Sequence, residues 1–421
     1  MIESLELLPG VNLRCYTDSR FKQGCLSFQL IRPMAREEAA MNALLPAVLL
    51  RGTKQYPDIR AITGRLDDLY GGSVGALVRR IGDYQTTGLH CTFLEDRFAL
   101  EGDAVFAPTV DFLRQLLLDP VLEDGVFCRE FVEGEKKNLI ATIESERNDK
   151  RAYAAGQLLK IMCRGDSFGI PRLGEKTQVA AIQPADLYRH YREILRTSAV
   201  ELFYVGSATA DHVRQLVMPL FDGMERSYEA LPTQTPFHMV PGREEQEEMT
   251  LAQAKLCMGF VTPITNRSEE FAAMQVCNTL YGGGMTSKLF MNVREKLSLC
   301  YSIGSGYHGS KGILTVAAGI DTEQEPLVRK EILAQLEACQ KGDFTQEELT
   351  AAKEAILSGL RGVTDSPGAI ENFYGTGFLS GLEITIDEYM DKVAAVDHRQ
   401  VMAAAESLQL HSVFFLKGVK A

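Results

Sequence analysis

One short motif occurs twice in this 421-residue chain, and its recurrence constrains the fold more than any other sequence feature. The motif Leu69-Tyr70-Gly71-Gly72-Ser73 returns 211 positions later as Leu280-Tyr281-Gly282-Gly283-Gly284. A second set returns in the same order, 217 positions later: Phe127, Glu130 and Lys136 become Phe344, Glu347 and Lys353. A length difference in one intervening loop reconciles the two spacings. Self-similarity at a nearly fixed period predicts that one domain is present twice, by internal duplication.

Each predicted copy mixes strands with helices. Alternating or continuous apolar residues predict strands in the first half at 11–16, 25–31, 84–93 and 199–205. Apolar residues three and four apart predict helices at 39–50, 58–69, 107–118, 127–147 and 152–162. In the second half the strands are predicted at 254–260, 299–307, 313–321 and 412–416. The helices there are predicted at 268–280, 286–296, 325–340, 345–361 and 386–395.

These elements predict an α+β protein of two homologous lobes, each a mostly antiparallel sheet covered by helices. The length supports this division, because single hydrophobic cores stop growing at about 250–300 residues. Residues 223–247 contain three prolines among polar and charged neighbours, which is typical of an exposed linker. We therefore expect an N-terminal lobe at 1–222 and a C-terminal lobe at 248–421.

Charge and cysteine content limit the classes of partner. The net charge of −12 disfavours nucleic acid and anionic membrane surfaces, which repel an acidic protein. An acidic surface suits cationic peptides, although it also serves simple solubility. The longest apolar run, 39–50, is too short for a membrane span of about twenty residues. Nine cysteines without a C-x-x-C pair argue against a disulfide framework and a zinc ribbon, so a reducing, cytoplasmic location is expected.

A glycine-rich segment, 282–290, precedes a helical segment and a strand in the second half. Leu289, Val293 and Leu297 lie one turn apart on the predicted helix, so Arg294 projects from a different side. Because the helix gives way to a strand near residue 299, Arg294 and Tyr301 can be aimed at one point. Glycines 282 to 284 leave backbone N–H groups uncovered at a helix start, where a peptide backbone or carboxylate can approach. The alternative is a helix-capping loop with a surface arginine and a half-buried tyrosine.

Together, 282–290 and 292–302 resemble the glycine-rich loop and the R-E-K-x-x-L-x-Y-S block of the insulinase-like (M16) peptidases. Residues 51–54 and 69–72 are similar to that family's first domain. The resemblance implies that Arg294 and Tyr301 donate hydrogen bonds to a substrate carbonyl, an oxyanion-type role. It implies that Gly282, Gly283 and Gly284 bind the substrate.

The chain departs from that family at the zinc motif. Active members carry H-x-x-E-H on a helix before a K/R-G-T turn, with two histidine ligands and a glutamate base. Anchoring on residues 51–53 places Ala43 and Ala47 at the histidines and Pro46 at the glutamate, while the distal ligand maps to Thr142. None of these side chains can do that zinc chemistry, and Pro46 can kink the helix. No pair among the seven histidines has metal-ligand spacing, so no cofactor is predicted.

Some M16 peptidases are heterodimers in which one subunit holds zinc and the other supplies the glycine-rich loop and the Arg/Tyr pair. This chain resembles the second kind, and among bacterial members it is most similar to the YmfF-like group. That group is usually paired with a zinc-bearing YmfH-like partner and is linked to elongation factor P modification. The resemblance implies a non-catalytic subunit that lends Arg294 and Tyr301 to a partner's site, in trans, for a peptide or unfolded polypeptide substrate.

Two alternatives stay open. The chain can be a scaffold or peptide-binding pseudo-peptidase with no role in cleavage. A self-sufficient enzyme with a relocated metal would need ligands that the sequence does not show. The isolated chain can also form a homodimer.

Overall fold

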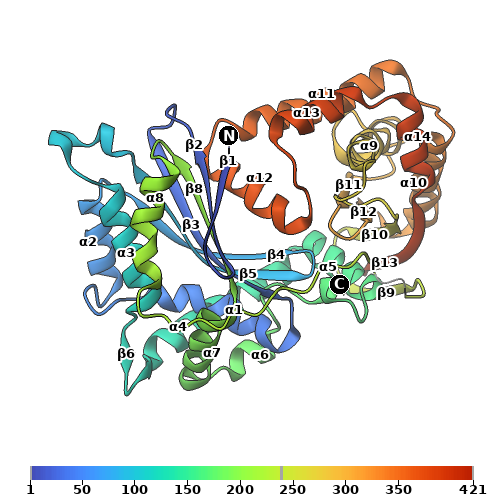
Figure 1. Ribbon diagram of the computed structural model, residues 1–421. Helices are drawn as coiled ribbons and strands as arrows, with labels where there is room; N and C mark the ends of the chain where they lie inside the picture. The colour runs from blue at the N-terminus through green and yellow to red at the C-terminus, as the bar shows by residue number, and fades with distance from the viewer. Residues whose placement is uncertain (1, 238–239, 420–421) are drawn as a thin grey trace. The chain divides into compact units, whose positions relative to one another are not determined.

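The computed structural model describes residues 2–237 and 240–419, which form two compact units of sheet and helix (Figure 1). Unit 1 contains the described residues up to Glu144 together with Ile170–Thr233 and Thr364–Thr376. Unit 2 contains Ser145–Gly169, the described residues of Gln234–Val363, and those from Gly377 on. Both units have antiparallel-rich sheets with packed helices, so the α+β prediction is confirmed.

Unit 1 is built on a six-stranded sheet with the order β1-β2-β8-β3-β5-β4. Its strands are β1 (Ile2–Leu8), β2 (Val11–Thr17), β3 (Gln23–Pro33), β4 (Ser73–Ile81), β5 (Tyr84–Leu94) and β8 (Ala199–Gly206). Every neighbouring pair is antiparallel except β2 and β8, which run parallel. A separate two-stranded ribbon joins β6 (Leu122–Glu123) to β7 (Val126–Phe127).

Unit 2 is built on a five-stranded sheet with the order β11-β12-β10-β13-β9. Its strands are β9 (Glu244–Thr250), β10 (Ala254–Val261), β11 (Ser302–His308), β12 (Ile313–Ile320) and β13 (Gln409–Val419). Only β9 and β13 run parallel. The order and directions of these five strands are the same as those of β4-β5-β3-β8-β2 in unit 1.

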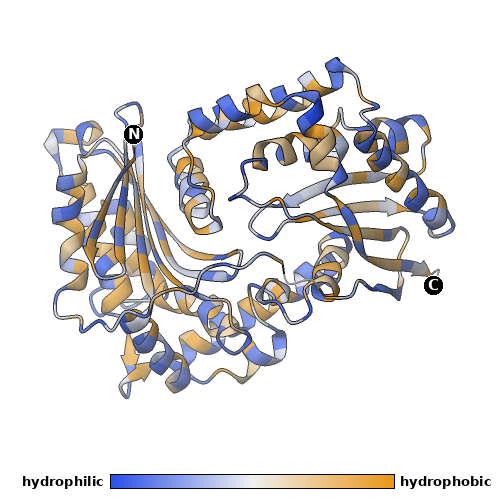
Figure 2. Cartoon of the chain, turned by 45° about the vertical axis from the view of Figure 1, so that its right-hand side comes forward, coloured by the Kyte–Doolittle hydropathy of each residue, from blue (hydrophilic) through white to orange (hydrophobic). Residues whose placement is uncertain are grey.

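One face of the first sheet carries the core of unit 1. Leu13, Leu202, Phe28 and Leu89 form a row of paired, fully buried residues across four strands. Helices cover this face, because each presents an apolar stripe to it, and polar and apolar residues alternate along them in Figure 2. These helices are α1 (Arg36–Leu49), α2 (Ile59–Asp68), α3 (Phe106–Leu118), α6 (Lys176–Ala181), α7 (Pro184–Thr197) and α8 (Ala210–Val217).

Unit 2 has helices α5 (Lys150–Met162), α9 (Phe271–Asn278), α10 (Glu325–Gln340), α11 (Gln346–Val363), α13 (Ile386–Ala395) and α14 (His398–Glu406). The two units together contain short 3₁₀ turns at η1 (Asp96–Phe98), η2 (Leu100–Gly102), η3 (Ser167–Gly169), η4 (Met218–Phe221) and η7 (Thr322–Gln324). Buried residues of α5, including Leu158 and Met162, form a core cluster with Cys257 and Phe414 of the second sheet. No helix in the described part of the chain is long and apolar enough to cross a membrane.

The two units are not contiguous in sequence. Helix α4 (Arg129–Asn148) begins in unit 1, and its last residues together with α5 belong to unit 2. Most of α12 (Pro367–Ser380) belongs to unit 1, although it follows α11 of unit 2. This grouping differs from a division into 1–222 and 248–421. Helix α5, which follows the long helix α4 of the first half, therefore belongs to unit 2. Helix α12, which follows the long helix α11 of the second half, belongs mainly to unit 1.

The repeated lysines of the two halves make the same contact. Lys136 on α4 donates from Nζ to the carbonyl of Ile182 at 2.9 Å, and Lys353 on α11 donates to the carbonyl of Val396 at 2.8 Å. Ile182 ends α6 and Val396 ends α13, each directly before the next helix. A lysine therefore satisfies a terminal helix carbonyl at corresponding places in both units.

The other face of the first sheet carries buried polar residues among apolar ones and is covered by α12, which lies opposite α2, α3 and α8 in Figure 1. The Glu371 side chain on α12 is 1% exposed and pairs with Arg79 of β4 through two bonds of 3.0 and 2.7 Å. Ser27 and Gln29 of β3 also donate to this carboxylate, at 2.8 and 3.1 Å. Four donors thus satisfy one buried charge, which such a charge requires to be tolerated.

We predict that Glu371→Ala destabilises the protein by about 3–5 kcal/mol, because it leaves the largely buried Arg79 guanidinium without its counter-charge. Urea unfolding measures the effect. Glu337→Ala, which breaks the exposed pair between Glu337 and Lys341, is the control and should shift the midpoint far less. Equal shifts for the two variants would contradict this account of α12.

Candidate functional site

The glycine-rich segment joins two π-helical stretches. Helix α9 continues into the π-helical turn η5 (Thr279–Gly283), Gly284 is extended at φ −158°, and after a turn the π-helix η6 (Leu289–Lys296) begins. π-Helices are rare and frequently lie at functional sites. The glycines therefore close the first helix, whereas the sequence predicted that they open the second. That prediction was wrong because residues 285–287 form a separate turn between them.

Hydrogen bonds hold the segment against β11. The Ser287 hydroxyl donates to the carbonyl of Gly284 at 2.6 Å and accepts from the N–H of Phe290 at 3.4 Å, which caps η6. Ser305 of β11 donates to the Asn278 side-chain oxygen at 2.7 Å. A Cβ at position 282 would lie 2.7 Å from the Ser305 hydroxyl oxygen, so only glycine fits there without movement. At position 284 a Cβ would meet nothing within 4 Å.

The C-terminal end of η6 turns the chain into β11. The N–H of Leu297 donates to the carbonyl of Asn292, five residues back, and Ser298 has a left-handed φ of 52°. Leu289 and Val293 are buried, but Leu297 is 44% exposed. The sequence placed Leu297 one helical turn after Val293. In the structure, bonds to the fifth residue back widen the helical turn, and Leu297 is the residue that caps the helix.

Arg294 and Tyr301 lie on either side of this turn and are accessible. The Arg294 side chain is 41% exposed; its guanidinium lies 4.6 Å from the Phe290 ring centroid, and its Nε is 3.5 Å from Glu295. Tyr301 is 58% exposed, and its hydroxyl donates to the Asp321 carboxylate at 3.2 Å. No hydrogen bond or ion pair joins Arg294 to Tyr301 within the described residues.

Asp321 raises the pKa of Tyr301, first through its negative charge and then through their hydrogen bond. The phenol therefore stays protonated and can donate. Sequence analysis missed both Phe290 and Asp321. Phe290 is four residues before Arg294, and that helical spacing could have indicated the contact. Asp321 had no local signal, because the pairing of β11 with β12 brings it beside Tyr301.

The same segment exposes apolar side chains to solvent. Within the described part of the chain, the large exposed apolar residues include Met285, Met291 and Leu297 in addition to Tyr301. Clustered apolar exposure on a soluble protein marks a surface that contacts another molecule. We call residues 282–301 the glycine-rich block.

Helix α1 of unit 1 contains the positions that the resemblance matches to the zinc motif of active M16 peptidases. Ala43 and Pro46 are buried and Ala47 is half-buried, and none has an atom that can ligate zinc. The helix runs through Pro46 from Arg36 to Leu49. Proline has no N–H for the carbonyl of Asn42, and the Thr87 hydroxyl of β5 donates to that carbonyl instead, at 2.6 Å.

Thr142 lies on the exposed side of α4, where its hydroxyl donates to the carbonyl of Asn138 at 3.0 Å. Within residues 2–237 and 240–419, no three His, Cys, Asp or Glu side chains are grouped so that they could hold a metal ion. The residues present therefore do not fit a zinc ion at the M16 positions.

Comparisons with known proteins agree with this geometry. The family model described as "Peptidase M16 inactive domain" matches residues 181–356. The chain is 28% identical over 411 residues to "Probable inactive metalloprotease YmfF" of Bacillus subtilis (strain 168), covering 98% of this chain and 96% of that protein. The crystal structure of a conserved protein from Enterococcus faecalis V583 has a TM-score of 0.92 at 28% identity, covering 100% and 99%. A peptidase M16 inactive domain from Pseudomonas fluorescens has a TM-score of 0.80 at 16% identity, over 100% and 99%, which shows a shared fold.

Substitutions at two glycines should distinguish a glycine that close packing requires from one whose backbone faces open space. We predict that Gly282→Ala destabilises the protein by about 1–3 kcal/mol, because the new methyl group displaces Ser305 and Leu289. Gly284→Ala should change stability by less than about 0.5 kcal/mol, since its backbone is extended and the space beside it is open. Urea unfolding of both variants measures the difference, and a larger loss for Gly284→Ala would contradict the placement of this loop.

Proposed function

We propose that this chain is a member of the M16 peptidase family and that it is the non-catalytic subunit of a two-subunit zinc metallopeptidase. A zinc-bearing, YmfH-like partner supplies the metal and the general base. This chain supplies the glycine-rich block, with Arg294 and Tyr301 as hydrogen-bond donors to the peptide substrate. The printed description of the Bacillus subtilis relative, "Probable inactive metalloprotease YmfF", supports the first half of this proposal.

The observation that carries the proposal is the exposure of both donors, Arg294 and Tyr301, to solvent. The polar partners that the structure shows for Arg294 and Tyr301 are the exposed carboxylates of Glu295 and Asp321, which a substrate oxygen can replace at low cost. Gly284 leaves space where a peptide backbone can approach. Donors aimed at the oxygen that becomes negative stabilise the transition state of peptide cleavage.

The chemistry of α1 supports the absence of activity in the isolated chain. Peptide hydrolysis of the M16 type needs two ligands and a carboxylate that activates water. Methyl groups and a proline ring stand at these positions, and the Thr87 hydroxyl stabilises the proline-containing helix. The exposed apolar residues of the glycine-rich block support contact with a partner subunit or a substrate.

We infer in addition that the two halves arose by duplication and that the protein works in the cytoplasm. Equal strand order in both sheets and equal Lys136 and Lys353 contacts support the duplication. A reducing compartment suits nine unpaired cysteines, of which eight are buried.

A second candidate is a peptide-binding pseudo-peptidase or scaffold with no role in cleavage. It is favoured by one observation: Arg294 and Tyr301 already have partners within the chain, as residues of a stabilised surface loop would. In that case, Arg294→Ala weakens a peptide complex or an assembly without changing any turnover.

Mixing this chain with its zinc-bearing partner should produce peptidase activity that neither protein has alone. We predict that Tyr301→Phe lowers kcat of the mixture about 10²–10³-fold, because it removes one donor to the developing oxyanion. Fluorogenic peptides measure the activity. Tyr228→Phe removes another partly exposed phenol outside the glycine-rich block and serves as the control, which should keep full activity.

If the mixture cleaves peptides equally well with Tyr301→Phe and with the unchanged chain, the donor role is wrong. If peptide binding by this chain falls with Arg294→Ala while partner activity never depends on this chain, the pseudo-peptidase explanation is correct.

A further inference from the structure

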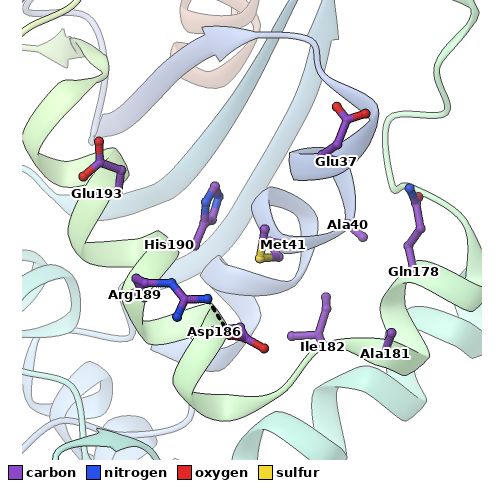
Figure 3. Close-up of a pocket in the computed structure, with 10 residues that line it drawn as sticks. All are labelled: Glu37, Ala40, Met41, Gln178, Ala181, Ile182, Asp186, Arg189, His190 and Glu193. Atoms are coloured by element: carbon purple, nitrogen blue, oxygen red, sulfur yellow. Dashed lines mark hydrogen bonds and ion pairs between the residues drawn. The ribbon is translucent and has the colours of Figure 1, made fainter.

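Two hollows in the described part of the chain differ in the charge of their linings. In unit 1, a cleft of about 650 Å³ lies between α1, α6 and α7, where carboxylates are mixed with the donors Arg189 and Gln178 (Figure 3). The charges of this cleft therefore select no class of ligand. In unit 2, a much smaller cavity of about 10 Å³ lies where β11, β12 and β10 are side by side. None of its lining residues belongs to the glycine-rich block or to the positions of the zinc motif.

A glycine in the middle strand makes room for this cavity. Gly319 of β12 is paired with both Lys255 of β10 and Ser302 of β11, so these two side chains lie on one face of the sheet, on either side of a residue without one. A Cβ at position 319 would lie 2.9 Å from Ser302 Oγ, 3.2 Å from Lys255 Nζ and 2.8 Å from Gln253 Oε1. Three polar atoms therefore converge above Gly319. A glycine inside a strand often marks a place where a ligand approaches the backbone closely.

Lys255 and Ser302 both have hydrogen atoms to donate at this place. The Lys255 ammonium gives one of its three hydrogens to Gln253 Oε1 at 2.7 Å, and this bond holds the ammonium near Gly319. The Ser302 hydroxyl has no hydrogen-bond partner within the residues that the structure describes, although its side chain is only partly exposed. One oxygen atom above Gly319 can therefore accept from both groups.

The charges in the lining are positive. Arg151 of α5 lines the cavity, and its guanidinium has no hydrogen bond or ion pair in the described part of the chain. Burial and then the charge of Arg151 lower the pKa of Lys255, so the two cations lie close enough to repel each other. The Cys257 thiol in the lining is neutral, because burial raises its pKa to about 12.

The two carboxylates on the neighbouring elements have other partners. Asp149, whose charge counteracts that of Arg151 at Lys255, accepts from two backbone N–H groups of α5 at 3.0 and 3.2 Å. Glu247 of β9 lies two strands away from Lys255 and accepts from the Tyr153 hydroxyl at 2.8 Å. Neither lines the cavity. A cationic ligand would therefore be repelled there, whereas an anion meets two positive charges.

The size of the cavity limits what can enter. About 10 Å³ holds about one water-sized atom, so a single oxygen of an anion fits. Lys255 and Ser302 can donate to that oxygen, and the exposed Arg151 remains for a second one. A carboxylate has two oxygens. A phosphate has more, and the lining offers no further charged donor to them.

We propose that this cavity binds a carboxylate group, with Lys255 and Ser302 as donors to one oxygen and Arg151 as donor to the other. The C-terminal carboxylate of a peptide and the side chain of an acidic residue share this chemistry. Ser302 directly follows the glycine-rich block in the chain, but the inference does not depend on the role of that block.

Isothermal titration of the full chain tests the proposal and distinguishes the two sources. N-acetyl-alanyl-alanine presents a C-terminal carboxylate, and Nα-acetyl-glutamate N-methylamide presents an acidic side chain. We expect at least one of them to bind about tenfold or more tightly than its own uncharged amide, N-acetyl-alanyl-alaninamide or Nα-acetyl-glutamine N-methylamide. The tighter carboxylate identifies the source, and inorganic phosphate is the competing anion. Binding should also raise the pKa of Lys255, measured by NMR at its ¹³Cε, because the carboxylate stabilises the charged ammonium.

Three variants locate the site. Lys255→Met removes the ammonium and should weaken binding about tenfold or more, and Ser302→Ala should weaken it about threefold. Gly319→Ala should abolish binding, because its methyl group takes the place of the ligand oxygen while the side-chain ends around it can move aside. Lys330→Met changes an exposed lysine of α10 in the same unit and should leave the affinity unchanged.

The proposal is overturned if neither carboxylate binds more tightly than its amide, or if phosphate binds more tightly than both. It is also overturned if Lys255→Met or Gly319→Ala, with unchanged urea unfolding, retains wild-type affinity. Because no partner subunit is present, these outcomes are independent of any peptidase measurement.

Discussion

Each sheet depends on one parallel pairing between strands that are far apart in the chain. β2 pairs with β8 across almost the whole first half, and β9 pairs with β13 across the second. All other neighbours in the two sheets are antiparallel. The last strand of each half therefore lies inside its sheet: β8 lies between β2 and β3, and β13 lies between β9 and β10. This arrangement buries β8 and β13, and it leaves β4 and β11 at the edges. The glycine-rich block reaches its position because it leads directly into edge strand β11.

In the glycine-rich block, one glycine is closely packed and another has open space beside it. Gly282 must be glycine because Ser305 and Leu289 occupy the space of a side chain, whereas Gly284 has free space around it. The block therefore has a packed position at Gly282, toward Ser305 of the sheet, and an open position at Gly284. A π-helical backbone is less favourable than an α-helical one, and its presence both before and after the turn at residues 284–288 indicates that this shape has a role.

Local sequence patterns predicted most central strands and long helices, because their apolar periodicity reports directly on burial. The patterns missed β9, since Glu244–Thr250 is acidic and lies at a sheet edge with one neighbour. They missed α12, which has glycines at 368, 375 and 377 and whose buried Glu371 is satisfied only by residues more than 290 positions away. For the candidate site, the sequence predicted Arg294, Tyr301 and the glycines, which stay predictions. It could not indicate Asp321 or Thr87, because long-range pairing and packing bring their partners to them.

The contact between Thr87 and Asn42 affects which substitutions helix α1 can accept. Placing glutamate at position 46 would give the backbone an N–H that competes with the Thr87 hydroxyl for the same carbonyl oxygen. Asn42 is also tied to Gln85 and His190, so a change at α1 is felt in β5 and α7. A metal-binding sequence at positions 43, 46 and 47 would therefore require coordinated changes in α1, β5 and α7, because Asn42 already connects these three elements.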